Sequence, residues 1–482
     1  MNDNELKRAF DPGAFRADAH RVVDILADYL ERSAGADRRR VLPAFSPDEM
    51  ARRWDAPISA EASEELLPLL TRVIEDSHHL HSPHYVGHQV SAPLPVSAVA
   101  DFVGSLLNNA SAVYDMGPVN VIHERRIVEW MCGLLGYGPD AGGILTSGGT
   151  LGNLTALLAA RQVMTEADVW SGGAAAGGEL AVMVSEQCHY SVRRAVGVMG
   201  LGTDNVIEVP TGPDFKIDTA TLAGCLKTAE ERGKRVFAVA ANACSTATGT
   251  YDDLAAIADF CEAHGLWLHV DGAHGASAAL SPRYRALLAG VHRADSIVWD
   301  AHKMLLVPAL ITAVIFRNGS DSYRSFAQQA SYLFEKASED EWYNYAHRTM
   351  ECTKTMMGLK LYVPLMVHGS GFFARYVETM YDLAHDFAAR IRSSADFELA
   401  VEPEANIVCF RFASSGAEDP SALQKKIRTR VLDSEDFYLV QTDLGGDTYL
   451  RCTLINPLTT IEHLEELLEL IRAVASEVVA SA

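Results

Sequence analysis

Three side chains that could do chemistry each come directly after a short apolar run of the sequence. Asp271 ends such a run in Trp267–His274, Lys303 follows one in Ala294–Met304, and His189 closes Ser185–His189. Ligands of α/β proteins bind at the carboxyl ends of the strands, which is where these three residues are expected. A lysine that is desolvated there would have a lowered pKa and would act as a nucleophilic amine.

A glycine-rich segment, Leu145–Asn153, lies earlier in the chain, between an apolar run and a helical pattern. Glycines let the backbone approach a ligand closely, and a helix N-terminus offers free N–H groups to an anion. Ser147, Thr150 and Asn153 would add hydrogen-bond donors. The segment is not a P-loop, because no Gly-Lys-Ser/Thr sequence follows it. Alone it indicates no more than a turn; beside the three reactive residues it predicts an anion site.

These four features together match the needs of one cofactor, pyridoxal 5'-phosphate. Its aldehyde binds a lysine amine, its ring nitrogen requires an acidic partner, and its phosphate suits a helix N-terminus. Read one at a time, Asp271 would be a turn residue and Lys303 a surface lysine. Their order and shared context favour the cofactor over those separate readings.

The elements that must position these residues follow an alternating pattern between about residues 90 and 310. Short β-rich runs alternate with segments of helical period, which predicts a mostly parallel α/β sheet covered by helices. The expected strands are Leu180–Ser185, Val206–Val209, Val236–Ala240, Leu266–Val270 and Ser296–Trp299. The expected helices are Asn153–Arg161, Thr219–Arg232 and Asp253–His264, and Ser171–Gly178 is expected to be a loop.

The two ends of the chain have different patterns. Residues 15–32 carry an amphipathic helical stripe. After about residue 360, a long helix, grouped strands and a closing helix (Gly371–Ser393, Ala405–Phe412, Tyr438–Gln441, Asp447–Leu454, and Ile461 to Val479) indicate a small α+β domain. We therefore divide the chain into an N-terminal arm and dimerisation segment (1–85), a large cofactor-binding α/β domain (86–360) and a small C-terminal α+β domain (361–482).

Composition excludes several classes of protein. The 482 residues carry a formal charge of −22, which argues against a general nucleic-acid binder, since such proteins need clustered Lys and Arg. The apolar runs are too short for a membrane helix, and the N-terminal stretch lacks the apolar core of a secretory signal. The eight cysteines are scattered without a C-x-x-C pair, which favours reduced thiols in a cytoplasmic protein.

From about residue 80 to 460 the sequence resembles the group II pyridoxal-phosphate-dependent amino-acid decarboxylases. The most specific stretch is Leu266–Met304, with His-Val-Asp-x-Ala, then Ala-Asp-Ser, then His-Lys. Ser331–Phe334 and Tyr449–Pro457 are similar to the glutamate and cysteine-sulfinate decarboxylase branch. The resemblance implies fold type I, as in aspartate aminotransferase, and a homodimer with shared active sites.

The resemblance also implies roles for individual residues. Lys303 would carry the Schiff base with the cofactor, and Asp271 would pair with its ring nitrogen. The ring would lie between Ala273 and His189, with Thr246 near its hydroxyl group. Tyr332, on a loop reaching the partner's site, would protonate the substrate carbon, and a Tyr there favours simple decarboxylation over aldehyde-forming chemistry. The remaining assignments are Ser147, Gly149, Thr150 and His302 at the phosphate, Arg451 at the substrate α-carboxylate, and His88 and Ala112 in the substrate pocket.

Two departures from the family pattern concern this site. Asp300 stands where relatives usually carry asparagine, and Gly272 and His274 stand where relatives often carry alanine and an aromatic residue. His88 and Ala112 replace polar and aromatic residues that shape the glutamate pocket. The amino acid that fits this pocket is therefore left open, with an acidic or related polar side chain indicated by the branch.

The predicted function is the conversion of an L-amino acid to its amine and CO₂, within amino-acid and carboxylic-acid metabolism. Two alternatives stay open: another reaction of the same cofactor, such as aldehyde synthesis, transamination or carbon–carbon lysis, and a non-catalytic relative. The histidine-rich stretch Ser77–His84 invites a metal reading. A zinc site needs three or four converging ligands, and the sequence offers no matching set, so no metal is expected.

Overall fold

The computed structural model describes residues 3–35, 40–43, 45–62, 64–326, 341–413 and 419–480. The chain forms two compact units, each containing segments that are distant in the sequence. Unit 1 comprises Met1–His88, Ala389–Ala400 and Cys409–Ala482, and unit 2 comprises Gln89–Ala388 and Val401–Val408. No helix within the described ranges combines the length and the apolar character that crossing a membrane requires. The three-part division expected from the sequence stays a prediction.

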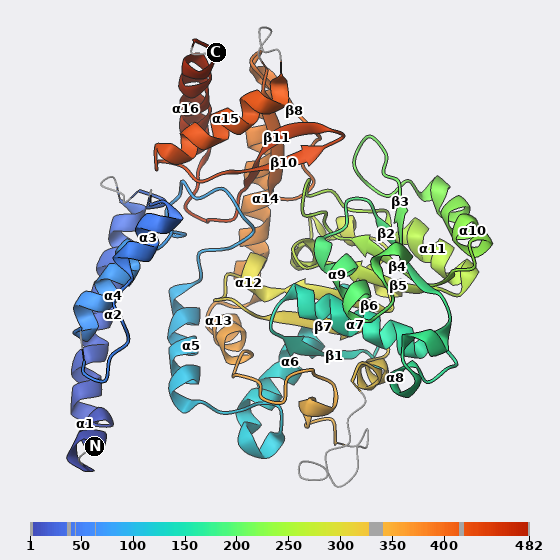
Figure 1. The fold of residues 1–482 in the computed structure, drawn as a ribbon, viewed down its shortest axis with the longest axis horizontal. Coiled ribbons are helices and arrows are strands. Elements are labelled where there is room, and N and C mark those ends of the chain that lie inside the picture. Colours follow the sequence, from blue (N-terminus) through green and yellow to red (C-terminus); the bar gives the residue numbers. More distant parts are fainter. Residues whose placement is uncertain are drawn as a thin grey trace. The chain divides into compact units, whose positions relative to one another are not determined.

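Unit 2 contains a seven-stranded sheet in the order β1-β7-β6-β5-β4-β2-β3 (Figure 1). Its strands are β1 Gly142–Thr146, β2 Leu180–Ser185, β3 Val206–Val209, β4 Arg235–Asn242, β5 Trp267–Asp271, β6 Ser296–Asp300 and β7 Thr312–Phe316. The pairs from β3 to β6 are parallel, and β7 runs antiparallel to both β1 and β6. All strands except β7 therefore end at the same edge of the sheet.

Unit 2 also contains ten α-helices within the described residues. They are α5 Pro95–Leu107, α6 Pro118–Leu135, α7 Gly149–Val163, α8 Val169–Gly172, α9 Tyr190–Val198, α10 Leu222–Glu231, α11 Leu254–His264, α12 Ala301–Met304, α13 Leu359–His368 and α14 Ser370–Ser393, whose last turn belongs to unit 1. Helices α7 and α9 pack together, and α7 lies on β4 to β7. Because strands are added in the opposite direction after β3, right-handed crossovers place α10 and α11 on the other face.

The core of unit 2 lies between α7 and the sheet. Small residues let the two approach closely, since Ala156, Ala159 and Ala160 of α7 are fully buried beside Val182 and Val298. A Cβ atom added at Gly152 would lie 3.0 Å from Val298 Cγ1 and 3.1 Å from Thr312 Cγ2. This close packing fixes the start of α7 over the carboxyl ends of the strands.

Unit 1 combines the N-terminal helices with the C-terminal sheet. Its elements are α1 Asp3–Ala9, α2 Pro12–Ala34, α3 Pro47–Arg53, α4 Leu66–Glu75, β8 Phe397–Leu399, β9 Ile407–Phe412 (whose first two residues belong to unit 2), α15 Pro420–Asp433, β10 Val440–Leu444, β11 Asp447–Thr453 and α16 Ile461–Ala480. The four strands pair in the order β10-β11-β9-β8. Backbone hydrogen bonds from Val86 to Tyr438 and from Thr453 to Val86 join the two ends of the chain.

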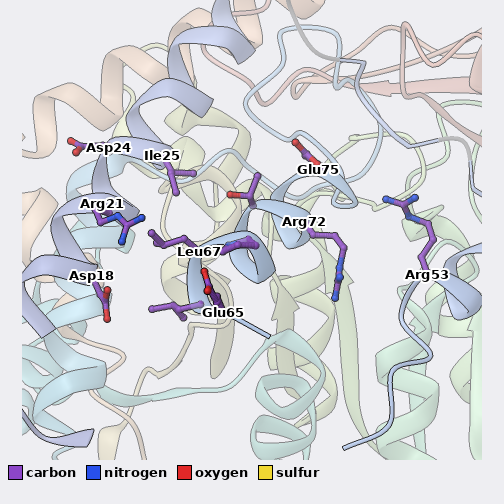
Figure 2. A pocket seen from close by; sticks show the side chains of 12 residues that line it. Asp18, Arg21, Asp24, Ile25, Arg53, Glu65, Leu67, Arg72 and Glu75 are labelled. Carbon is purple, nitrogen blue, oxygen red and sulfur yellow. The ribbon is translucent and has the colours of Figure 1, made fainter. Parts of the chain in front are cut away.

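Helices α2 and α4 of unit 1 line an open hollow of mixed charge (Figure 2). Asp18, Arg21 and Asp24 reach it from α2, and Arg72 and Glu75 reach it from α4. Part of the apolar stripe expected on residues 15–32 is solvent-exposed, because 58% of Val23 and 43% of Leu26 are accessible. None of the site residues predicted from the sequence lines this hollow.

Three local expectations differ from the structure. Ser171–Gly178 is not a plain loop, because α8 ends within it and a 3₁₀ turn spans Ala174–Gly177. Strand β10 begins at Val440, two residues later than expected. Strand β7 was not predicted, although all five of its residues are buried apolar or threonine side chains. The expected fold class, a mostly parallel α/β sheet with a small C-terminal α+β region, is confirmed.

Candidate active site

The carboxyl edge of the unit 2 sheet gathers the reactive side chains that the sequence singled out. Asp271 is the last residue of β5, and Asp300 is the last residue of β6. Lys303 lies in the short helix α12 that follows β6, and His189 caps the N-terminus of α9 just beyond β2. Both Asp271 and Lys303 lie close enough to His189 to influence its protonation.

Lys303 lies beside a carboxylate that belongs to its own strand–helix junction. Its Nζ atom is 3.0 Å from Asp300 Oδ2, and 18% of the lysine side chain is exposed. Burial lowers the pKa of Lys303, but the negative charges of Asp300 and Asp271 more than offset that effect, so the pKa lies above its ordinary value. The expectation of a lowered pKa is therefore wrong for the chain without its cofactor, because desolvation is outweighed by the neighbouring charges.

Asp300, the departure from the family pattern, is held from two sides. Thr312 of the neighbouring strand β7 donates its hydroxyl hydrogen to Oδ1, and His302 Nε2 lies 3.7 Å from Oδ2. Its carboxylate also faces the start of α7, since a Cβ atom added at Gly149 would lie 3.1 Å from Oδ2. Asp300 is therefore the counter-ion of Lys303.

Asp271 and His189 are joined through a buried asparagine. Asn153 Nδ2 donates to Asp271 Oδ2 at 2.9 Å and to Ser191 Oγ at 2.8 Å. Ser191 Oγ is 2.7 Å from His189 Nδ1. The second Asp271 oxygen accepts from the backbone N–H of Ala273 at 3.2 Å. Burial is the main cause that lowers the pKa of His189, so its ring is neutral at neutral pH.

The glycine-rich segment forms the turn from β1 into α7. Gly148 has φ of 110°, a conformation that favours glycine, and within the described residues no side chain caps the helix that starts at Gly149. Thr150 follows in the first turn. Ser147 donates to Glu351 Oε1 at 3.0 Å. Asn153 does not serve this turn as expected, because it lies one helical turn further on and donates to Asp271.

The other expected cofactor contacts lie at the same edge. Thr246 is in the loop after β4, which is closed by a hydrogen bond from Ser245 N to Thr250 O at 2.8 Å. Ala273 follows β5 and is buried. His302 precedes Lys303, and its Nδ1 atom lies 2.9 Å from the Ile311 carbonyl oxygen.

Ala112, expected in the substrate pocket, is 1% exposed and accepts a backbone hydrogen bond from Ala346.

Two expected substrate residues belong to unit 1. Arg451 is a buried residue of β11, paired with Val440 of β10. His88 lies beside the Tyr438 ring, with 5.8 Å between ring centroids. Burial lowers the pKa of His88 most, and the positive charges of Arg451 and Arg428 lower it further. Unit 1 therefore holds a group of basic side chains around Tyr438.

Tyr332 and the Ser331–Phe334 segment lie outside the described residues, so the assigned role of Tyr332 stays a prediction. Among the described residues, no three His, Cys, Asp or Glu side chains are arranged so that they could hold a metal ion.

Sequence reasoning missed several residues that support this site. His269, Ser191 and Glu351 each bond to a predicted site residue or to Asn153, and Thr312 bonds to Asp300. One signal was available: His269 and Asp271 are two residues apart on a strand, so their side chains leave the same face of the sheet. The other contacts join segments far apart in the sequence, such as Ser147 and Glu351, and no local pattern encodes them.

The residues at this edge fit pyridoxal phosphate. They supply an amine on Lys303, a buried carboxylate on Asp271 that already accepts two hydrogen bonds, and an uncapped helix start at Gly149. Hydrogen bonds to a carboxylate favour its charged form, which is the form a protonated ring nitrogen requires. Asp300, which faces Gly149, is paired with Lys303 and accepts a hydrogen bond from Thr312.

Comparisons with known proteins agree with this chemistry. The pyridoxal-dependent decarboxylase conserved domain matches residues 47–413. Cysteine sulfinic acid decarboxylase of Rattus norvegicus is 31% identical over 86% of this chain and 84% of its own. Aromatic-L-amino-acid decarboxylase of Bacillus atrophaeus is 29% identical over 95% of both chains. The crystal structure of mouse CSAD in its apo form superposes with a TM-score of 0.90 at 26% identity, covering 96% of this chain and 99% of that one.

The cofactor is therefore pyridoxal phosphate, and the family resemblance noted in the sequence is confirmed. The chain belongs to the pyridoxal-dependent decarboxylase family and is a pyridoxal-phosphate-dependent amino-acid decarboxylase.

Proposed function

We propose that this enzyme converts an L-amino acid with an acidic or related polar side chain to the corresponding amine and CO₂. The observation that carries the proposal is that Lys303 lies at the sheet edge where α7 begins, close enough to Asp271 for the charge of that carboxylate to raise the lysine's pKa. The similarity to cysteine sulfinic acid decarboxylase supports an acidic substrate.

We assign the cofactor contacts to residues at this edge. When bound, pyridoxal phosphate supplies an electron-withdrawing ring that accepts the electron pair of the cleaved Cα–carboxylate bond. The amine of Lys303 would hold the cofactor covalently, and Asp271 would keep a proton on the ring nitrogen. Ala273 and His189 would enclose the ring, and Thr246 would lie near its hydroxyl group. The phosphate would be held by Ser147, Gly149, Thr150 and His302.

Proton handling is divided among three side chains in this proposal. Lys303 must lose a proton before its amine can react, and the Asp300 carboxylate lies 3.0 Å from its Nζ atom. Tyr332 would donate the proton that replaces the lost carboxylate on the substrate carbon.

The substrate contacts are proposed from the family resemblance. Arg451 would bind the α-carboxylate, since a buried guanidinium forms strong charge-assisted hydrogen bonds with a carboxylate. His88 and Ala112 would contact the side chain of the substrate. The basic residues near His88 favour a substrate side chain that carries an anion.

We further propose that the enzyme acts as a homodimer with shared active sites in the cytoplasm. One face of α5 in unit 2 is apolar and exposed. Val99, Phe102, Val103, Leu106 and Leu107 are each between 46% and 64% accessible. A second copy of the chain would remove this apolar surface from water.

The test is CO₂ release from purified protein with added pyridoxal phosphate, across a panel of L-amino acids with acidic, sulfinic, aromatic and basic side chains. Amine, aldehyde and peroxide are measured in parallel, and Lys303→Ala is the control without the reactive amine. We expect CO₂ and a matching amine from an acidic member of the panel. Aldehyde with peroxide would instead show oxidative chemistry, and a protein that binds the cofactor without releasing CO₂ would contradict the proposal.

A further inference from the structure

A continuous chain of hydrogen bonds runs from the interior of the unit 2 sheet to Asp271 and His189, two of the residues proposed to contact the cofactor. Trp267 Nε1 and His269 Nδ1 each lie 2.9 Å from Ser296 Oγ. His269 Nε2 lies 2.9 Å from Asn153 Oδ1. Asn153 Nδ2 reaches Asp271 and Ser191, and Ser191 reaches His189.

The direction of donation along this chain is fixed by its ends. An indole nitrogen can only donate, and a carboxylate can only accept. Asn153 must therefore turn its NH₂ group toward Asp271, because the reverse orientation would set an amide oxygen against a carboxylate oxygen. Its oxygen then faces His269, which must carry its proton on Nε2. Ser296, which accepts from Trp267, gives its own hydrogen to His269 Nδ1.

The same logic fixes the proton on His189. Asn153 donates to Ser191 Oγ, so the single hydrogen of that hydroxyl is free to point at His189 Nδ1. The backbone N–H of Ser191 also points at Nδ1, at 3.3 Å. With two donors directed at it, Nδ1 carries no proton, and the neutral ring holds its proton on Nε2.

Neither histidine becomes charged near neutral pH, so neither changes this pattern of donors and acceptors. Burial lowers the pKa of His269 to about 4, and Asp271 offsets only part of that effect. The charged groups that face His189 are Asp271, Lys303, Asp300 and Arg194, and their effects leave its pKa below the ordinary value. The hydrogen-bond network therefore presents only donors to Asp271 Oδ2 and to His189 Nδ1.

We propose that Asn153 is a positioning residue which, when held by His269, orients the Asp271 side chain through a hydrogen bond and holds His189 as the neutral tautomer protonated on Nε2. The inference rests on the proposed function, since it assumes that Asp271 and His189 contact the cofactor. It adds two residues that would touch neither cofactor nor substrate but hold two residues that do.

The test compares four variants with the wild-type enzyme. Asn153→Leu and His269→Leu each interrupt the chain of hydrogen bonds, at Asn153 and at His269. His269→Gln keeps a donor toward Asn153 without a titratable ring. Asn205→Leu is the matched control, since Asn205 is also buried and also donates twice from Nδ2, to Leu201 O and to Glu179, at the far edge of the sheet.

The first readout is the His189 ring in cofactor-free protein labelled with ¹⁵N-histidine, its resonances identified by their loss in His189→Gln. We expect an unprotonated Nδ1 and a protonated Nε2 in the wild type, His269→Gln and Asn205→Leu. A larger share of the tautomer protonated on Nδ1 is expected in Asn153→Leu and His269→Leu, because the Ser191 hydroxyl is no longer held and the backbone N–H of Ser191, at 3.3 Å, is the donor that stays directed at Nδ1. Because no cofactor is present, this result stands whether or not the enzyme decarboxylates the proposed substrates.

The second readout is the Kd for pyridoxal phosphate and the pH at which the visible absorption of the loaded protein changes. Loss of a charge-assisted hydrogen bond predicts a Kd about tenfold higher in both leucine variants, with a shifted absorption midpoint. His269→Gln should restore both values. A wild-type tautomer in Asn153→Leu, or equal effects of His269→Gln and His269→Leu, would overturn the inference. An equal effect of Asn205→Leu would also overturn it.

Discussion

At the scale of single residues, the pairing of Lys303 with Asp300 determines how readily the amine reacts. The aspartate is 3.0 Å from the lysine Nζ atom, and together with Asp271 it raises the lysine's pKa. Only the neutral amine can attack an aldehyde, so a raised pKa reduces the reactive fraction at neutral pH. An asparagine at this position, which carries no charge, would not exert this effect.

We therefore predict that Asp300→Asn speeds the covalent attachment of pyridoxal phosphate at pH 7.5. Without the aspartate charge the pKa of Lys303 falls, and a fall of one unit makes the neutral amine about tenfold more abundant. The rate is measured from the visible absorption after the cofactor is mixed with cofactor-free protein. The gain should shrink as the pH rises toward the lysine pKa, because the wild-type amine is then also neutral.

Glu262→Gln serves as the control for this experiment, because it removes a surface carboxylate of α11 that pairs with Arg293. It should leave the attachment rate unchanged. An attachment rate in Asp300→Asn equal to that of the wild type at every pH would show that Asp300 does not govern the amine.

At the scale of elements, β1 and the turn into α7 are anchored by a buried ion pair. Lys354 Nζ lies 2.7 Å from Glu124 Oε1, and both side chains are fully buried. The same carboxylate oxygen accepts the backbone N–H of Leu145 at 2.8 Å. Two residues after Leu145 comes Ser147, so the pair fixes the strand end from which the glycine-rich turn departs.

Replacing one partner of this pair should destabilise the protein strongly. Lys354→Met leaves the Glu124 carboxylate buried without its counter-charge, which costs about 3 to 5 kcal/mol. The measurement is the urea midpoint of unfolding. The double variant Glu124→Gln with Lys354→Met removes both charges and should recover much of the loss, and equal losses in the single and double variants would contradict this account.

The close approach of α7 to the sheet gives a further prediction. Gly152→Val places methyl groups against Val298 and Thr312, where even a Cβ atom lies at 3.0 and 3.1 Å. The helix must move outward and draw Asn153 away from Asp271, so the Kd for pyridoxal phosphate should rise about tenfold if that hydrogen bond is lost. Gly224→Val in α10 is the matched control, because a Cβ atom there meets nothing within 4 Å. A Gly152→Val enzyme that binds the cofactor normally would disprove this coupling.

Much of this arrangement was predictable from the sequence, and what was missed has physical reasons. Strand–helix alternation locates β2 to β6, because apolar runs and the glycines after them are local signals. Strand β7 was missed because it follows α12 closely and runs antiparallel, without a helix of its own to mark it. The network through Asn153 was missed because each hydrogen bond joins residues of different elements, and only packing decides which way an asparagine side chain points.

At the scale of the whole molecule, the exposed apolar face of α5 predicts self-association. Phe102→Glu together with Leu106→Glu should convert a dimer to a monomer, because two charges would have to be buried against a second copy. Light scattering after size-exclusion chromatography measures the mass. Val479→Glu on α16, where 47% of the valine is exposed, is the control and should not change it. A wild-type protein that is monomeric and fully active would disprove both the dimer and the shared sites.

The joining of both chain ends in unit 1 has a consequence for biosynthesis. Val86 bonds to Tyr438 and to Thr453, so the N-terminal segment reaches its partners only after some 350 further residues have been made. At about 5 to 20 residues per second, a ribosome needs about 20 to 70 s for that stretch. During this time unit 2, which is nearly continuous in the sequence, can fold, while the N-terminal segment emerges with Val41 and Val86, which are buried in the folded protein, still uncovered. We expect the nascent chain to recruit chaperones at its N-terminal segment until the last strands leave the ribosome.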